Sequence, residues 1–280
     1  MDFPLAARNP AVAIQPMNSP VGEPVASTPV DPIEPSSNAQ ALLRAPAQAQ
    51  THPLEALPAS ARNPHEARLR TWLRHERTQE RAVRIAVNHI NANRGEFSQG
   101  ELVLVQLDLL RLPGEPIHPS RGQTYVFQLA GGQLRDLGAF NSTSQPTMTT
   151  GSYFNTRVHG PSFIRPGAYE VSRTRQSDSF LGGKYRFAPD NFPTHRDTNH
   201  DGALTPDEQR IHGTHADAIL IHAWGQIGTD GQGNTGGVGL VGCQGIWHAE
   251  CADFEAAIAQ GRGPTMTYIL VRDGMAAANA

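Results

Sequence analysis

The sequence predicts a mostly β fold, a sandwich or barrel with short helices, which a helix and a disordered leader precede. Three observations predict this class. From residue 101 onward, short β-rich runs alternate with Gly, Pro, Asn and Ser. Only one clear further helical stretch, near Asp253 to Gln260, interrupts these runs. Before them, residues 1–62 hold half of the chain's 22 prolines and almost no aromatic residue.

The segment 1–62 is the predicted leader. Ala, Ser and Gln separate its prolines, so the segment has little apolar surface to bury. That surface is too small to offset an ordering entropy of about 1 to 2 kcal/mol per residue. A tail without function and a secretion or docking segment both fit this composition.

An amphipathic helix and a linker are predicted over 63–100. Asn63 can cap the helix, Pro64 suits the first helical position, and Gly95 marks the end. The apolar side chains recur mostly at helical spacing, opposite a face rich in Arg and Glu: Leu69, Trp72, Leu73, Val83, Val87 and Ile90. We expect this apolar stripe to pack against the β domain rather than against a membrane or a partner helix.

The β domain is predicted over 101–273, and residues 274–280 form a tail. Its strand-like runs are ELVLVQLDLLRL, TYVFQLAGGQLRDLGAF, GAYEV, AILIH and MTYILVR. A net charge of −3 gives no basic field for nucleic acid. No run approaches the roughly 18 apolar residues that a membrane span needs, and the first residues lack the pattern of a standard signal peptide. We therefore expect neither nucleic acid nor a membrane span.

A calcium-loop signature lies inside this domain, over 197–208. The sequence DTNHDGALTPDE fits the twelve-residue EF-hand loop at every ligand position, and Gly202 permits its sharp turn. The predicted ligands are the side chains of Asp197, Asn199, Asp201, Thr205 and Glu208 and the backbone carbonyl of Ala203. Because the incoming segment has no helical period, we expect a structural Ca²⁺ clamp with only an outgoing helix; a capped acidic turn is the alternative.

Cys243 and His222 are the candidate nucleophile and base. A glycine-rich loop follows His222 and is long enough to fold back and bring the two side chains together. Gly242 leaves room for a carbonyl to approach the thiol, and histidine is the usual partner that activates a cysteine at neutral pH. A small buried cysteine without catalytic function is the alternative. The spacing alone leaves both open.

These residues resemble the L,D-transpeptidase catalytic domain, whose signature is a histidine and then, after a spacer, Ser or Thr, any residue, Gly and Cys. Here 17 residues separate His222 from Leu240-Val241-Gly242-Cys243. The segment TYVFQLAGGQLRDLGAF looks like the family's opening hairpin, RPGAYEV like its turn and strand, and 253–255 and 266–271 like its closing helix and strand. The resemblance covers roughly residues 122–273. The chain departs from the pattern at Leu240 and at Gln244-Gly245, where the family has an apolar-Arg pair.

The resemblance implies an enzyme that acts on peptidoglycan stem peptides, as a transpeptidase or a carboxypeptidase. Cys243 would attack the acyl carbonyl, with His222 as base and then as acid. A catalytically inactive, calcium-stabilised module that binds cell wall or a host protein is the alternative. The expected setting is an antibacterial effector that is secreted without a standard signal peptide and acts in a periplasm or cell wall, with secretion machinery or an immunity protein as partners; a phage lytic enzyme also fits.

Three weaker readings involve the remaining cysteine and histidines. Cys251 with His248 forms a second, weaker nucleophile pair, because nothing upstream matches it. A disulfide between Cys243 and Cys251 would silence the enzyme. A zinc site from His212, His215 and His248 lacks a clear ligand spacing.

Overall fold

The computed structural model describes residues 34–35, 68, 71–72, 78–93, 95–113, 115, 121–146, 161–178, 182–188, 191–211, 214–216, 219–229, 235–238 and 242–275. Of the predicted leader, these ranges include only Glu34 and Pro35, which form β1 and pair in parallel with Gln133 and Leu134. The rest of the leader and the end of the tail lie outside the described residues.

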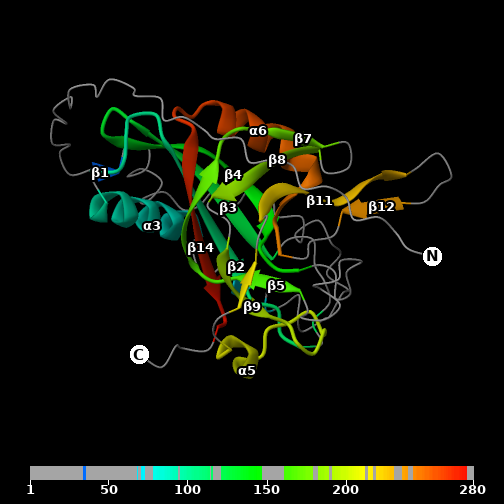
Figure 1. Cartoon of the computed structure of the whole chain (residues 1–280). Helices are drawn as coiled ribbons and strands as arrows, with labels where there is room; N and C mark the ends of the chain where they lie inside the picture. The colour runs from blue at the N-terminus through cyan, green and yellow to red at the C-terminus, as the bar shows by residue number, and fades with distance from the viewer. Residues whose placement is uncertain are drawn as a thin grey trace, which may run out of the picture.

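A closed β-barrel forms the body of the described chain, which confirms the predicted fold class. Eight strands follow one another in the order β11-β13-β4-β3-β2-β14-β6-β8, and β8 pairs back with β11 (Figure 1). They are β2 (Leu102–Leu109), β3 (Gly122–Ala130), β4 (Gln133–Thr143), β6 (Gly167–Ser172), β8 (Gly182–Ala188), β11 (Leu220–Thr229), β13 (Gln244–Trp247) and β14 (Thr265–Asp273).

Strand β2 explains why one predicted run is almost continuously apolar. All of its residues are buried, because alternate side chains face two different cores. Val103 and Val105 pack under helix α3 (Thr78–Ala92), while Leu102 and Leu104 belong to the core inside the barrel. The strand therefore has no solvated face.

The hairpin β3–β4 turns at Gly131-Gly132, inside the segment TYVFQLAGGQLRDLGAF that looks like an opening hairpin. Both glycines have positive φ, +60° and +74°, the backbone that a two-residue turn between antiparallel strands requires. The pairing continues from this turn to Gly122 and Ser142. The turn thus sets the register of the strand that later pairs with β13.

Helix α3 covers the outside of the barrel with the predicted apolar stripe. Trp72, Val83 and Ile90 are buried and Val87 packs beside them, whereas the side chains of Leu69 and Leu73 lie outside the described residues. The Arg81 guanidinium donates two hydrogen bonds to Asp273 of β14, of 2.5 and 2.7 Å, and the Trp72 indole donates a third of 2.7 Å. For its described side chains, the prediction of a packing face is confirmed. No helix in the described part of the chain is long and apolar enough to cross a membrane.

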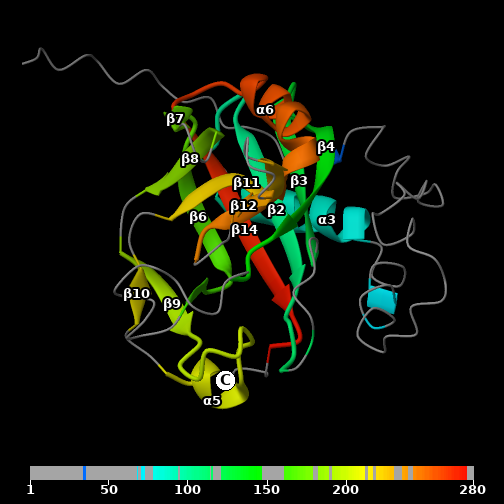
Figure 2. The same cartoon turned by 90° about the vertical axis from the view of Figure 1, so that its right-hand side faces the viewer.

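Helix α6 (Cys251–Ala259) lies across one end of the barrel, after the 3₁₀ turn η2 (His248–Glu250) (Figure 2). Phe254, Ala257 and Ile258 point into the inner core. Edge-to-face contacts of the Phe254 ring with Phe140 and Tyr185 fill this end. This is the second helix that the sequence predicts.

A small antiparallel sheet and helix α5 (Pro206–Gln209) lie toward the other end (Figure 2). The sheet has the order β10-β9-β5, with β10 at His215–Ala216, β9 at Phe192–Arg196 and β5 at Ser162–Ile164. Two further strands extend the barrel sheet, β7 (Gln176–Asp178) beside β8 and β12 (Thr235–Val238) beside β11. The predicted calcium loop joins β9 to α5.

Candidate active site and acidic loop

Strands β11 and β13 carry the predicted nucleophile and base. They pair in parallel, with Ile221 opposite Gln244 and His222 opposite Gly245. Cys243 immediately precedes β13, so its neighbour across the pair is Leu220, whose backbone hydrogen-bonds to the thiol. The chain therefore folds back between His222 and Cys243, as the sequence predicts. Because side chains alternate along a strand, His222 lies on the face opposite that of Ile221 and Gln244, which point into the barrel.

Gly242 is a necessary glycine, for a reason that the sequence did not indicate. Its φ is +156°, and a Cβ there would lie 3.1 Å from the Ser162 Cβ and 3.5 Å from the Ile219 Cδ1. From the sequence, Gly242 was expected to leave room for a carbonyl to approach the thiol. The structure shows that it admits β5 against the turn that carries Cys243.

The His222 ring is buried, with 5% of the residue exposed. Its Nδ1 lies 2.6 Å from the carbonyl oxygen of Ala223. A carbonyl only accepts, so Nδ1 carries the hydrogen in this contact and Nε2 is the nitrogen with a basic lone pair. The tautomer that this contact selects is the one that can take a proton through Nε2.

The Cys243 thiol is half-buried, and its electrostatic surroundings are mixed. Burial raises the pKa of the thiol, while the hydrogen bond from the Leu220 backbone and the charge of Lys184 act to lower it. The thiol is therefore protonated at neutral pH, and its attack on a carbonyl needs a base. Lys184 is the cross-strand partner of His222 in the β8–β11 pair.

Lys184 is a site residue that the sequence reasoning missed. It lies in GGKYRFA, a run for which no strand was predicted, and its nearness to Cys243 arises only when β8 closes the barrel against β11. No motif in the sequence connects the two positions. A prediction of the barrel's closing pair would have been the one route to it.

Cys251 is the first residue of α6 and has a different environment. Its Sγ lies 3.6 Å from the Ile246 carbonyl oxygen and 3.7 Å from that of Trp247. Burial, with Glu255 and Glu250 nearby, raises the pKa of this thiol to about 12. Cys251 is therefore a weak nucleophile, and both cysteines are free thiols without the disulfide that would join them.

A shallow hollow and an aromatic row flank His222. The hollow lies between β11 and α6, and Cys243 is not among its lining residues, which are Tyr185, Ile221, His222, Ala223, Ile246, Cys251, Phe254 and Glu255. Trp224 and Trp247 are strand partners with ring centroids 5.4 Å apart, and the His248 ring lies 4.5 Å from that of Trp247. By strand alternation, Trp224 shares the face of His222.

The acidic loop over 197–208 has the backbone turn that its sequence predicts. Gly202 has a φ of +76°, and its N–H donates to Asp197 Oδ2 at 2.7 Å. Asp201 N donates to Asp197 Oδ1 at 3.1 Å and to Asn199 Oδ1 at 3.0 Å, and Ala203 N donates to Asp201 Oδ1 at 2.8 Å. The side-chain oxygens of the first three predicted ligands thus bond within one tight loop.

Glu208, the last predicted ligand, ties the two ends of this loop together. Its Oε2 accepts from Thr205 N and Oγ1 at 2.9 and 2.8 Å in a capping box that begins α5. Its Oε1 accepts from Thr198 N and Oγ1 at 2.7 and 2.9 Å and from Asn199 N at 3.3 Å. Burial raises the pKa of Glu208, but the bonds from Thr205 and Thr198 outweigh it and leave the pKa below its usual range.

The chemistry of the loop fits a hard cation such as Ca²⁺. Asp197 is completely buried, and its pKa is raised by burial and by the charges of Glu208 and Asp201, against the N–H of Gly202. This excess of negative charge favours a cation, and every predicted side-chain ligand is an oxygen. Among the described residues, no group of three or more His, Cys, Asp or Glu side chains is placed to hold a metal ion, and both Glu208 oxygens accept from backbone and hydroxyl donors. The same observation covers His215 and His248; His212 lies outside the described residues.

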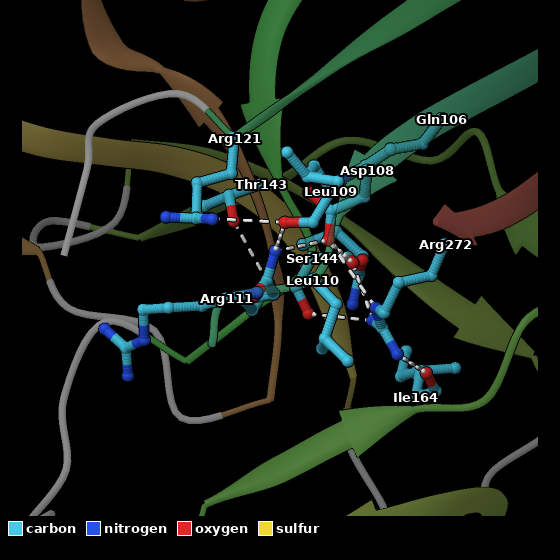
Figure 3. Close-up of polar contacts among 12 residues, drawn as sticks. Gln106, Asp108, Leu109, Leu110, Arg111, Arg121, Thr143, Ser144, Ile164 and Arg272 are labelled. Atoms are coloured by element: carbon cyan, nitrogen blue, oxygen red, sulfur yellow. Dashed lines mark hydrogen bonds and ion pairs between the residues drawn. The ribbon is translucent and has the colours of Figure 1, made fainter. Parts of the chain in front are cut away.

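A buried ion pair stands between the acidic loop and the barrel (Figure 3). Asp108 Oδ2 accepts from Ser144 Oγ at 2.6 Å and from Gln145 Nε2 at 2.9 Å, and it lies 3.5 Å from Arg272 Nε. Arg272 also donates to the Ile164 carbonyl at 2.9 Å. These bonds connect β2 and β14 of the barrel with the residues that follow β4 and with β5 of the small sheet.

Arg111 joins this ion pair to the acidic loop. Its backbone N–H donates to Gln145 Oε1 at 2.7 Å, and its guanidinium donates to the Gly202 carbonyl. A second link runs from the Asp197 N–H to the Pro161 carbonyl at 3.1 Å, next to Ser162 of β5. The loop is thus anchored at two places, to the barrel core through Arg111 and to the small sheet at Pro161.

Comparisons with known proteins give little beyond these observations. No protein-family model matches the chain, and neither does any curated protein. Among solved structures, it is similar to the helical cell shape determining protein Pgp2 from Campylobacter jejuni, at 12% identity and a TM-score of 0.32, and to a variant of Pgp2 at 11% and 0.33. Each alignment covers 62% of this chain and 49% of that chain, so the chain spans about half the length of the structures it matches.

Proposed function

We propose that the protein is a cysteine-dependent enzyme that acts on peptidoglycan stem peptides, of the L,D-transpeptidase or L,D-carboxypeptidase type. The observation that carries this proposal is the parallel pairing of β11 with β13, which sets the His222 strand directly beside the turn of Cys243. It joins two residues that are distant in sequence and that occupy the histidine and cysteine positions of the family's signature. The wall compartment, where stem peptides lie, is the proposed place of action.

The proposed reaction begins with a proton transfer, because the thiol is protonated at rest. His222 Nε2 takes the Cys243 proton as sulfur attacks the acyl carbonyl, and the imidazolium then returns the proton to the leaving amine. A thioester remains on Cys243. Water that hydrolyses it gives a carboxypeptidase, and a second amine that attacks it gives a transpeptidase.

Replacement of Cys243 tests this proposal directly. Purified Cys243→Ala and wild-type protein are incubated with stem peptides, and the products are followed by mass spectrometry. We expect the variant to lose turnover and Cys251→Ala, the matched control, to keep it, since the Cys251 thiol is held protonated near helix α6. Equal turnover in wild type and Cys243→Ala contradicts the proposal.

A non-catalytic, calcium-stabilised binding module is the second candidate. The burial that raises the pKa of Cys243 favours it, because a buried thiol is also what a merely structural cysteine shows. If the protein is such a module, the Cys243→Ala variant should bind wall fragments or a protein as well as the wild type does. Sedimentation with purified wall material, compared between the two forms, distinguishes the candidates.

We also propose that Ca²⁺ is the ligand of the acidic loop. Asp197, Asn199, Asp201 and Glu208 would supply side-chain oxygens, Thr205 a direct or water-bridged contact, and Ala203 its carbonyl. The ion's charge would offset the carboxylates that now raise the pKa of Asp197. Its role would be structural, through the anchors at Arg111 and Pro161.

A further inference from the structure

Gln244, which directly follows the candidate nucleophile, is buried in the barrel core. It is completely inaccessible to solvent, at a position where the L,D-transpeptidase signature has an apolar residue. Its Nε2 donates to the Gly242 carbonyl at 3.1 Å, and its Oε1 lies 2.9 Å from the Tyr268 hydroxyl. The Gln244 side chain therefore hydrogen-bonds, on the core side of the turn, to the backbone of the residue that precedes Cys243.

This amide is the end of a chain of buried polar groups across the barrel. The Tyr268 hydroxyl also lies 2.5 Å from Gln106 Oε1, which lies 3.2 Å from Thr124 Oγ1, and Thr124 lies 2.9 Å from Ser142 Oγ. Five strands thus contribute to it: β13, β14, β2, β3 and β4. Polar groups buried in this way are costly unless they are paired.

The hydrogens available on these buried polar groups determine which group donates in each contact. A hydroxyl has one hydrogen, so Tyr268 cannot donate to both glutamine oxygens, while Gln106 Nε2 is buried with no partner. Turning the Gln106 amide by 180° removes the double donation, because its NH₂ then donates to the Tyr268 oxygen, and it leaves a carbonyl oxygen instead of an NH₂ without a partner, which is less costly. The Tyr268 hydrogen is left for Gln244 Oε1, and Gln244 donates to Gly242.

We infer that Gln244 is a positioning residue for Cys243, and that Tyr268 holds it in place; this inference rests on the proposed function of Cys243. Gly242 has a φ that few other residues adopt, and a glycine has many alternative conformations. The Gln244 bond fixes the Gly242 carbonyl toward the core. The turn is then left with the one conformation in which the thiol meets the Leu220 backbone, beside the His222 strand.

Two variants remove the bond by different means, and each has a matched control in the same barrel. Gln244→Leu deletes the amide, and Tyr268→Phe deletes only the hydroxyl that orients it. Gln128→Leu is the first control, since Gln128 is also buried and donates to a backbone carbonyl, that of Gln260, at 2.6 Å. Tyr125→Phe is the second, since its buried hydroxyl bonds to Thr78 at 2.6 Å under helix α3.

The measurement is the pH profile of iodoacetamide alkylation at Cys243, followed by mass spectrometry without substrate. We expect the midpoint of this profile to rise by about one pH unit in Gln244→Leu and Tyr268→Phe, which is a tenfold loss of thiolate at a fixed lower pH. In both controls, the midpoint should equal that of the wild type. Circular dichroism confirms that each variant is folded. Where stem-peptide turnover is measurable, kcat falls by about the same factor and KM stays.

A midpoint that stays at the wild-type pH, or moves below it, in folded Tyr268→Phe overturns the inference. An equal rise in the Gln128→Leu and Tyr125→Phe controls also overturns it, because the effect would then be a general loosening of the barrel. Failure of the proposed function is a separate result: Cys243→Ala would keep turnover. The alkylation profile decides the positioning role in either case, since it needs no substrate.

Discussion

His222 and Lys184 face each other across the antiparallel pair β8–β11, and the charge of Lys184 acts on the Cys243 thiol. The candidate base and a cation therefore lie on two strands that meet only where the barrel closes, next to the strand pair that carries Cys243. A positive charge near a thiol favours its thiolate, so the cation offsets part of the cost of burial.

Removal of this cation is expected to raise the pKa of Cys243. In Lys184→Met, alkylation of Cys243 at neutral pH should slow by about two- to fivefold, the scale of a partly screened charge. Arg135→Met, which removes an exposed positive charge from β4, is the control and should alkylate at the wild-type rate. An unchanged rate in Lys184→Met would show that the lysine has no electrostatic role at the thiol.

The two cysteines are expected to differ in reactivity. Iodoacetamide at neutral pH should label Cys243 before Cys251, because Glu250 and Glu255 add to the burial that raises the pKa of the Cys251 thiol to about 12. Turnover should decline in step with the labelling of Cys243, as peptide mapping can follow. Labelling of Cys251 first, with activity retained, would remove Cys243 as the nucleophile.

Calcium is expected to stabilise the fold. A single loop of this kind binds in the range of about 10⁻⁴ to 10⁻³ M, and a tenfold excess over Kd adds roughly 1.4 kcal/mol to the free energy of unfolding. The melting temperature of the wild type should therefore be higher with millimolar Ca²⁺ than with chelator. In Asp201→Ala, the two melting temperatures should be equal. Asp207→Ala is the control, since Asp207 is exposed on α5 outside the ligand set. Equal wild-type melts in both buffers contradict the proposal.

The contact between helix α3 and the barrel is expected to be acid-sensitive. Burial raises the pKa of Asp273, but the bonds from Arg81 and Trp72 outweigh it and bring the pKa below its usual value. A lowered folded pKa gives stability that is present above the unfolded pKa, about 3.9, and is lost as the pH falls through the folded value.

Asp273→Asn tests this contact by denaturant unfolding at pH 7 and at pH 3. The variant should lose about 1 to 2 kcal/mol at pH 7, the scale of charge-assisted bonds at a partly exposed site, and show a smaller further loss in acid. Asp253→Asn, at an exposed position on α6, should match wild type at both pH values. If Asp273→Asn and the wild type lose the same free energy of unfolding between pH 7 and pH 3, Asp273 is not the source of the acid sensitivity.

The sequence predicted elements whose evidence is local. The run of β2 and the apolar stripe of α3 each follow from composition or periodicity within a few residues. Strand β8 was missed because it begins with two glycines and has charged residues among its apolar ones, and β13 because it is only 4 residues long; long-range pairing stabilises both.

The same distinction applies to the candidate site. The acidic loop was found because its ligands lie in one run, and Cys243 and His222 were found through a known signature. Lys184 depends on the closing pair, and the bonds of Gln244 reach Tyr268, which is distant in sequence. Gln244 departs from the family's signature, and its burial in the core is evident only in the structure.

The closing pair of the barrel is one of its short ladders, beside β6–β8 and β4–β13, which pair over two residues each. Strands β8 and β11 pair over three residues, Leu220 to His222, whereas β2 and β14 pair over Val103 to Leu109. Short ladders open locally at lower free energy than long ones. In native-state hydrogen exchange, the amides of 220–222 should therefore exchange before those of 103–109. The barrel would open locally at the candidate site while the strands under α3 stay paired. A bulky stem peptide could then reach Cys243 without global unfolding.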